Sequence, residues 1–398
     1  MVETTTQPVT TSQITTSQTP VAGAARRHDI DALRVFAFGI LILYHVGMFY
    51  VADWHWHVKS AYLSESLQWL MLLVNPWRMA LIFLISGVAV HFLLRKVPAS
   101  LFALMRTRRL LVPLFFGMVV VVPPQAYVQA LSTGAFDDNY LQFLWRYFTF
   151  QPWPAWAFDG AQPVGVTWNH LWYLPYVLTY SLLLAALLPV LRSLYFQMFV
   201  NAFHRLRGWQ VLLLPALPFL FYEWWLSDRF PTTHAFYDDW YYHAVSCTVF
   251  FLGFVLGSRD GLWRELQRLR WLALGLAIVS YVCLMLVAPY LELRLSALAH
   301  KVVSVFNGWF WLVAVLGWAH HTLNRPFRWL AYATEAIFPW YILHQTFTVL
   351  AGYYLSRWAL GPVVEPLVVT LLTIGGCLVV HEYGVRRWRY WRPLFGMR

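Results

Sequence analysis

The chain has 398 residues, of which 60% are hydrophobic and 12% are charged, and its formal net charge is +11. This composition excludes an ordinary soluble globular protein, in which about a quarter of the residues are charged. Apolar runs near the roughly 20 residues that a helix needs to cross a hydrocarbon core recur along the chain, and they predict an all-α, polytopic integral membrane protein.

The two ends of the chain differ in composition from the apolar body. Residues 1–25 are rich in Thr, Ser, Gln and Pro, and such a segment buries too little apolar surface to fold. We therefore predict a disordered cytoplasmic tail over 1–25, a membrane domain over 26–390, and a short basic cytoplasmic tail over 391–398.

The apolar runs predict about ten transmembrane helices. We place them at about 33–52, 76–94, 109–130, 171–191, 210–227, 242–258, 271–290, 302–321, 335–355 and 363–383. If the N-terminus is cytoplasmic, the loops on that side hold most of the Lys and Arg residues, as cytoplasmic loops generally do. This asymmetry predicts that both termini are cytoplasmic. It also accounts for the positive charge without a nucleic-acid partner.

One predicted cytoplasmic loop, "RKVPASLFALMRTRRLLVP", holds Arg106, Arg108 and Arg109 at the mouth of the third helix. Such a cluster is usually a topology anchor. It also fits a phosphate clamp, because guanidinium groups bind phosphate oxygens in a bidentate way.

Two predicted outer loops, 131–170 and 228–243, are rich in aromatic residues. Aromatic rings at a membrane edge commonly form an interfacial belt. They also suit sugar binding when carboxylates accompany them, because the rings stack on C–H faces and the carboxylates accept hydroxyl protons. We give these two interpretations equal weight.

Arg34 and His45 share one face of the first predicted helix. They lie eleven residues apart, which is three turns plus about 20° and roughly 16 Å along the axis. Asp31 falls close to the same stripe. Since ionisable residues within a membrane usually serve function, we expect charge at the cytoplasmic mouth of this helix and an imidazole near the middle of the membrane.

Two further histidines are expected in the membrane region. His170 opens the fourth span near the outer surface, and His344 lies about half way along the ninth. On the second span, Ser86 and Gly87 mark a place where two helices could approach closely, and packing alone explains them. The sequence contains no metal-binding or nucleotide-binding motif of known spacing, so we expect no metal.

Four segments together resemble the acyltransferase-3 family of membrane O-acyltransferases. They are "DIDALRVFAFGILILYH", with its arginine, ten residues and histidine; "IFLISG"; "RTRR"; and "AIFPWYILHQ". The resemblance implies transfer of an acyl group from cytoplasmic acyl-CoA to a hydroxyl of an extracytoplasmic glycan, at the inner membrane of a bacterium. It implies that Arg34, Arg106, Arg109 and Ser86 bind the donor, and that His45, Asp31, His170 and His344 serve catalysis.

The fourth predicted helix departs from the common family pattern. Many members carry His-x-Trp-Ser-Leu followed by a glutamate, whereas this chain reads "HLWYLPYVLTY". In this respect it is more similar to the periplasmic-glucan succinyltransferase branch. That likeness implies succinyl-CoA, with acetyl-CoA as the other donor, and an osmoregulated glucan as acceptor. A glycan synthase or a second copy of the chain is a further expected partner.

The residues also admit other functions. A transporter of a glycan or a small anion would likewise need many spans and polar groups near the midplane, although the two halves show no evident repeat. A non-catalytic glycan-binding partner of a synthase is a third interpretation. Whether His45 acts as a general base or carries the acyl group itself is open at this stage.

Overall fold

The computed structural model describes residues 27–154, 156–158, 165–287 and 290–397, so the predicted tail over 1–25 lies outside the described residues. Within these ranges the chain is helical and contains no strand beyond one isolated bridge between Val51 and Ser64. The helices are α1 His28–Tyr50, α2 Ser66–Leu94, α3 Ala99–Phe116, α4 Pro123–Thr133, α5 Tyr140–Phe148, α6 Tyr173–Ala186, α7 Leu188–Leu191, α8 Leu194–Arg205, α9 Trp209–Leu213, α10 Leu217–Trp225, α11 Trp240–Leu256, α12 Gly261–Val282, α13 Leu293–Thr322, α14 Leu330–Leu355 and α15 Val364–Val379.

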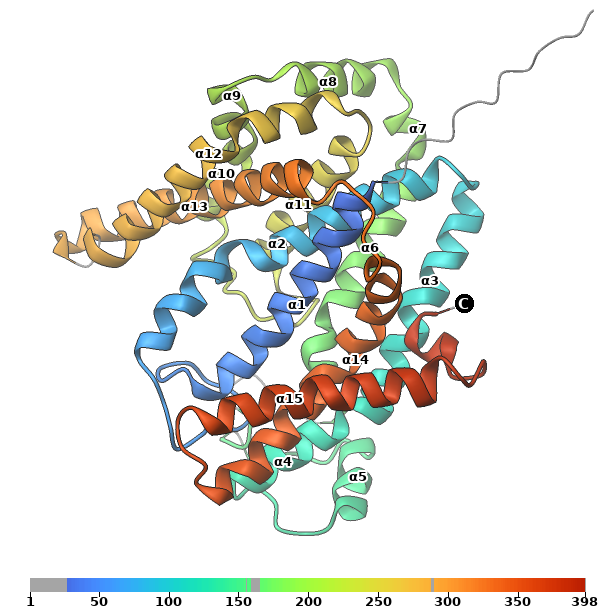
Figure 1. Cartoon of the computed structure of the whole chain (residues 1–398), viewed down its shortest axis with the longest axis vertical. Coiled ribbons are helices and arrows are strands. Elements are labelled where there is room, and N and C mark those ends of the chain that lie inside the picture. Colours follow the sequence, from blue (N-terminus) through green and yellow to red (C-terminus); the bar gives the residue numbers. More distant parts are fainter. Residues whose placement is uncertain (1–26, 155, 159–164, 288–289, 398) are drawn as a thin grey trace, which may run out of the picture.

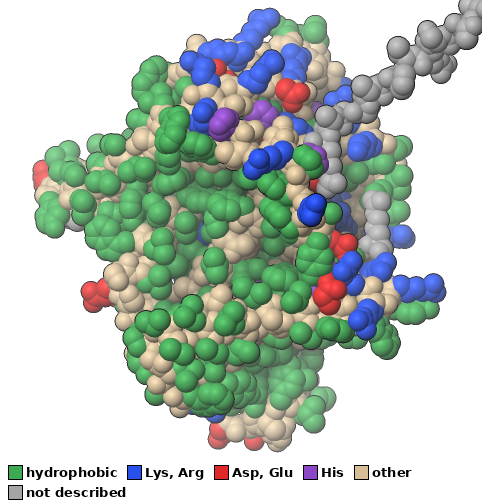
Figure 2. All heavy atoms as spheres, viewed as in Figure 1, with side chains coloured by type: hydrophobic (Ala, Val, Ile, Leu, Met, Phe, Trp, Pro, Cys, Tyr) green, Lys and Arg blue, Asp and Glu red, His purple; other side chains and the backbone are tan. Residues whose placement is uncertain are grey.

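Six helical segments of the described chain are long and apolar enough to cross a membrane. They are His28–Tyr50, Ser66–Leu94, Ala99–Thr133, Gly261–Val287, Leu295–Thr322 and Val364–Val385. Hydrophobic side chains cover most of the face seen in Figure 2, and Lys and Arg gather at the end where α8 lies. Water does not favour such a surface, whereas lipid does. The protein is therefore a multi-pass membrane protein.

Several helix boundaries differ from the predicted spans. The third helix begins at Ala99, ten residues before the predicted start, so the "RTRR" segment lies on α3 and not in a loop. A π-helical turn at Gly117–Val121 then joins α3 to α4. The predicted fifth span is broken into α9, a 3-10 turn and α10, because Pro215 and Pro218 lack the amide hydrogens that a continuous helix requires.

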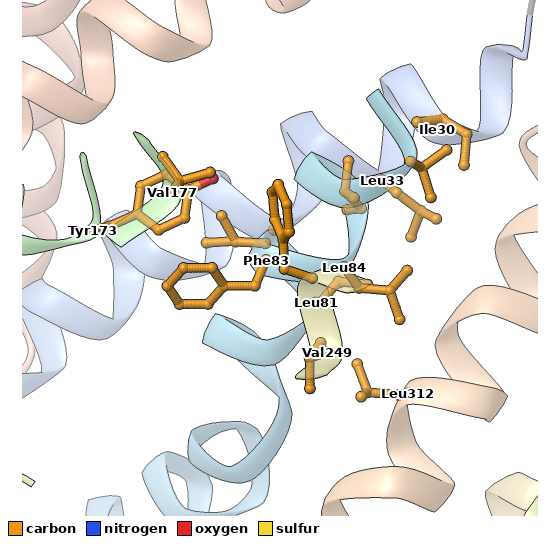
Figure 3. Close-up of a cluster of buried hydrophobic side chains, with 14 of the residues drawn as sticks. Ile30, Leu33, Leu81, Phe83, Leu84, Tyr173, Val177, Val249 and Leu312 are labelled. Atoms are coloured by element: carbon orange, nitrogen blue, oxygen red, sulfur yellow. The ribbon is translucent and has the colours of Figure 1, made fainter. Parts of the chain in front are cut away.

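The centre of the fold is built from α1, α2, α11 and α14, which lie side by side although they are distant in sequence. Figure 1 shows α1 and α14 crossing the middle of the molecule, and Figure 3 shows apolar side chains from α1, α2, α6, α11 and α13 converging in one cluster. The backbones of α2 and α11 touch. A Cβ on Gly87 would lie 1.8 Å from the carbonyl oxygen of Phe250, and one on Gly253 would lie 2.0 Å from that of Leu84.

The C-terminal segment packs against the helices. After α15 the chain turns back, and a 3-10 turn at Arg392–Phe395 brings the buried ring of Phe395 to 5.2 Å from that of Phe116. Gly396 adopts a left-handed conformation with φ of 65°. The described part of the predicted tail, up to Met397, thus belongs to the packed body, because an apolar side chain anchors it.

Candidate active site

A large cavity lies among the ends of α1, α2, α3, α6 and α14 that correspond to the predicted cytoplasmic side. Its volume is about 660 Å³, and five residues that the sequence singled out line it: Asp31, Arg34, Ser86, Arg106 and Arg109. Four of them are the predicted donor-binding residues. The fifth, Asp31, lies fourteen residues from His45, which is about 21 Å along an α-helix. Asp31 therefore lines the inner cavity together with Arg34, at a distance from the histidine.

The lining of this inner cavity combines positive charge with anchored polar groups. Arg106 and Arg109 are three residues apart on α3, so they share a face. The Nε of Arg106 donates to the Oγ of Ser181 at 3.1 Å, and this bond orients the guanidinium. The hydroxyls of Ser86 and Tyr173 are 2.5 Å apart, so Ser86 has a polar role beyond helix packing. The arrangement suits an anionic ligand.

His45 and His344 form a hydrogen-bonded pair deeper in the protein. The Nδ1 of His45 lies 2.7 Å from the Nε2 of His344, and the two rings are nearly parallel. The Nδ1 of His344 lies 2.8 Å from the carbonyl oxygen of Tyr341. A carbonyl oxygen can only accept, so Nδ1 of His344 carries the hydrogen and its Nε2 accepts one from His45. This chain of hydrogen bonds leaves Nε2 of His45 unprotonated and able to receive a proton.

His170 completes a group of three histidines. It lies in a 3-10 turn before α6, its Nε2 donates to the carbonyl oxygen of Ile342 at 2.9 Å, and its ring meets that of His344 at 5.3 Å. It is buried, as His344 is, whereas His45 is partly exposed.

Aromatic rings separate the histidine group from the inner cavity. Phe38 and Tyr173 line the cavity, and their ring centroids lie 5.2 Å and 6.1 Å from that of Tyr341. Tyr341 in turn lies 6.1 Å from His344. A ligand group must pass this aromatic layer, or displace it, to travel from the arginines to His45.

A second, smaller cavity lies on the other side of the histidines. Its volume is about 200 Å³. Its lining residues are His55, Trp56, His57, Ala126, Gln129, Tyr147, Trp153, Phe158, Gly165, Thr167 and Asn169. The ring of Trp56 lies 5.3 Å from that of His45, so one residue of the cavity wall also packs against His45. The predicted aromatic loop contributes Tyr147 and Trp153 to this lining.

A polar network around the outer cavity escaped the sequence reasoning. Gln345 donates to Gln125 at 3.1 Å and lies 3.0 Å from the Nε2 of His57. Gln125 in turn donates to Thr346 at 2.7 Å. Two signals could have revealed this network. Gln345 directly follows His344, and Gln125 is a polar residue within an apolar span, where such residues commonly serve function.

The loop before α11 is held by a buried carboxylate. Asp239 accepts hydrogen bonds from the hydroxyl of Tyr176 at 2.7 Å and from the backbone amide of His234 at 3.2 Å. Burial alone would raise the pKa of Asp239, but these hydrogen bonds outweigh burial, so the pKa lies below its ordinary value. The loop is thereby fixed over the start of α6, where the ring of His234 stacks on that of Trp172.

Comparison with known families decides the class of this protein. The family described as "Acyltransferase domain" matches residues 27–382, a range that contains all of the predicted site residues. The chain belongs to this acyltransferase family. The resemblance to the acyltransferase-3 family is thereby confirmed.

The match to individual relatives covers a much shorter part of the chain than the family match does. The chain is 29% identical over 105 residues to "Glucans biosynthesis protein C" of Escherichia coli, in three strains. The aligned stretch covers 26% of this chain and 26% of the relative, so it spans about a quarter of either protein. It supports the glucan-modifying branch of the family. No solved structure matches the chain.

Proposed function

We propose that this membrane acyltransferase moves an acyl group from cytoplasmic acyl-CoA to a hydroxyl of an extracytoplasmic glycan. One observation carries the proposal: the His45–His344 pair lies between an arginine-rich inner cavity and an aromatic outer cavity. In this arrangement a charged donor would approach the pair from the arginine side, and a sugar would approach it from the aromatic side.

The proposal includes an orientation in the membrane. We place the chain in the inner membrane of a bacterium with ten passes and both termini in the cytoplasm. The six long apolar helices are joined by α6, by α9 with α10, by α11 and by α14, which are shorter, broken or more polar. The excess of Lys and Arg at the end that holds the inner cavity supports this orientation.

In this proposal, the arginines of the inner cavity hold the phosphates of acyl-CoA. Arg34, Arg106 and Arg109 present guanidinium groups to one space, and each can bind phosphate oxygens through two hydrogen bonds. The pantetheine arm then extends along α1 past Phe38 toward His45. Seven residues separate Phe38 from His45 along α1, about 10 Å of helix, so an extended arm can span the gap once the aromatic layer yields.

The chemistry then follows from the free nitrogen of His45. Its Nε2 takes the proton of the acceptor hydroxyl while the hydroxyl oxygen attacks the thioester carbonyl. The carbon–sulfur bond breaks, an ester forms, and the thiolate recovers the proton from His45. His344 keeps Nε2 of His45 unprotonated and correctly aimed, so it is a positioning residue. The route through an acylated His45 uses the same nitrogen.

The outer cavity would hold the acceptor. Trp153 and Tyr147 offer aromatic faces, and His57, Gln129 and Asn169 offer hydrogen-bonding groups, which is the combination that binds sugar rings. The likeness to "Glucans biosynthesis protein C" makes a periplasmic glucan the acceptor that we propose.

The position of Arg78 supports the proposal that the transferred acyl group carries a second carboxylate, as succinyl does. Its guanidinium lies 3.4 Å from the ring centroid of Tyr44, the neighbour of His45, and its Nη2 donates to Asn75 at 3.1 Å. Its Nε is buried and has no hydrogen-bond partner among the described residues. A cation within the membrane region usually serves a ligand. We expect Arg78→Gln to lower kcat/KM for succinyl-CoA more than for acetyl-CoA.

The direct test uses purified protein, acyl-CoA labelled in the acyl group, and a glucan acceptor. Wild type should transfer label, and His45→Ala should not. Arg106→Ala should raise the KM for acyl-CoA, whereas Arg108→Ala, an exposed arginine on the same helix, should not. A transporter would leave the thioester intact and show no thermal shift with CoA. Label transfer by His45→Ala at the wild-type rate would refute the catalytic assignment.

A further inference from the structure

A third cavity lies beside the inner one and is lined in part by the C-terminal segment. Its volume is about 610 Å³. Its lining residues are Arg109, Thr334, Glu335, Phe338, Glu382, Arg386, Arg387, Arg392, Gly396 and Met397. Figure 2 shows basic and acidic side chains gathered over the end of α15. The proposed reaction leaves this C-terminal cavity unused.

The C-terminal segment is built into this wall. A Cβ on Gly396 would lie 2.3 Å from the ring of Phe338 and 3.1 Å from the carbonyl oxygen of Arg109. Glycine is therefore needed here for close approach as well as for its left-handed backbone. Together with the buried ring of Phe395, this contact fixes Arg392 in place beside the cavity.

The charges of the cavity are unbalanced. Arg386 binds both lining carboxylates, with its Nε 3.0 Å from Glu335 and its Nη1 3.1 Å from Glu382. Arg387 and Arg392 have no carboxylate partner among the described residues. The Nε of Arg392 is buried without a hydrogen-bond partner in that part of the chain, and its Nη2 donates to the carbonyl oxygen of Arg386 at 2.8 Å. Buried donors of this kind favour an anion.

The C-terminal cavity is continuous with the inner cavity in its lining. Arg109, Thr334 and Phe338 line both. A ligand whose pyrophosphate is held by Arg34 and Arg106 can therefore extend past Arg109 toward Arg387 and Arg392. Coenzyme A carries a second anionic group besides its pyrophosphate, the phosphomonoester on its ribose.

We propose that the C-terminal cavity binds the ribose 3′-phosphate of the acyl-CoA donor, with Arg387 and Arg392 as its ligands. The inference rests on the proposed function and deepens it. The protein then distinguishes acyl-CoA from the acyl thioester of dephospho-CoA, which lacks only this phosphate. The phosphate of an anionic lipid headgroup at the cytoplasmic face could bind the same two arginines, and the experiment distinguishes these two sources of phosphate.

The experiment compares kcat/KM for acyl-CoA and acyl-dephospho-CoA, with the same acyl group and the full-length protein in zwitterionic nanodiscs. Wild type should prefer acyl-CoA by about tenfold to a hundredfold, the range expected for charge-assisted hydrogen bonds. Arg392→Gln and Arg387→Gln should each lower this ratio toward one. Arg389→Gln is the matched control, because Arg389 lies on the same segment, bonds to Tyr390 and does not line the cavity.

The outcomes are distinct. A wild-type ratio near one, with both donors turned over, overturns the inference and leaves the proposed function standing. Failure to use either donor refutes the proposed function itself. A ratio near one together with an Arg392-dependent thermal shift on adding anionic lipid assigns the cavity to lipid and also overturns the inference. Arg392→Gln can loosen the C-terminal segment. Arg387→Gln is therefore the second variant, because Arg387 is exposed and its replacement removes no hydrogen bond within the described chain.

Discussion

Replacing His344 tests the role of the histidine pair directly. In His344→Ala, Nδ1 of His45 loses the acceptor that lies 2.7 Å away, and the ring is free to rotate and to change tautomer. The lost hydrogen bond is worth about 0.5–1.5 kcal/mol, and 1.36 kcal/mol is a factor of ten in rate. The whole general-base contribution that it supports is about 10²–10⁴.

We therefore expect kcat of His344→Ala to fall by about tenfold to a thousandfold. The KM for acyl-CoA should change little, because the aromatic layer separates this pair from the arginines of the inner cavity. His344→Gln should retain more activity, since its amide oxygen can accept the Nδ1 hydrogen of His45.

The assay follows release of the CoA thiol with a thiol-reactive chromophore at saturating glucan. His321→Ala is the control, because His321 is exposed at the end of α13, and thermal unfolding midpoints verify that each variant is folded. Wild-type kcat in a folded His344→Ala protein would contradict the positioning role. A His344→Gln protein as slow as His344→Ala would contradict the tautomer argument.

Three further predictions address the acceptor cavity, the helix packing and pH. Trp153→Ala should raise the KM for glucan by about tenfold, from the loss of one aromatic contact, while an unchanged KM would exclude this residue from the acceptor site. Gly253→Ala should lower the free energy of unfolding by about 1–3 kcal/mol through overpacking. Gly275→Ala should not, because a Cβ at Gly275 meets no atom within 4 Å. Equal stabilities of the two variants would contradict the contact between α2 and α11. Because the pKa of Asp239 is lowered on folding, its contribution is full above the pKa of an unfolded carboxyl, about 4, and is lost as pH falls through the folded value. The thermal midpoints of wild type and Asp239→Asn should therefore converge in acid; a constant difference, or an equal effect of Asp238→Asn, would refute this.

Much of the site could be predicted because its residues are recognisable by type and place. Ionisable residues are rare within apolar spans, so Arg34, His45 and His344 stood out. Arg106 and Arg109 stood out by clustering. The structure brings every predicted site residue to one of two places, the inner cavity or the histidine group. Their roles in binding and catalysis remain predictions.

Other parts of the site gave weaker signals. His57 and Gln129 are ordinary in a sequence, and only their convergence around the outer cavity distinguishes them. The sequence predicts a basic cytoplasmic tail over 391–398, because a charged segment after the last span usually is one. Phe395, a single apolar residue, packs this segment against Phe116.

The sequence by itself determined the membrane class, most of the helices and the shared face of Arg34 and His45, because hydropathy and helical periodicity are local properties of the chain. Tertiary structure alone decided which groups meet. His45 and His344 are 299 residues apart in the chain and 2.7 Å apart in space, and Asp31 was separated from His45 by the length of its own helix. Contacts of this kind depend on how helices pack, and packing is set by the shapes of many side chains at once.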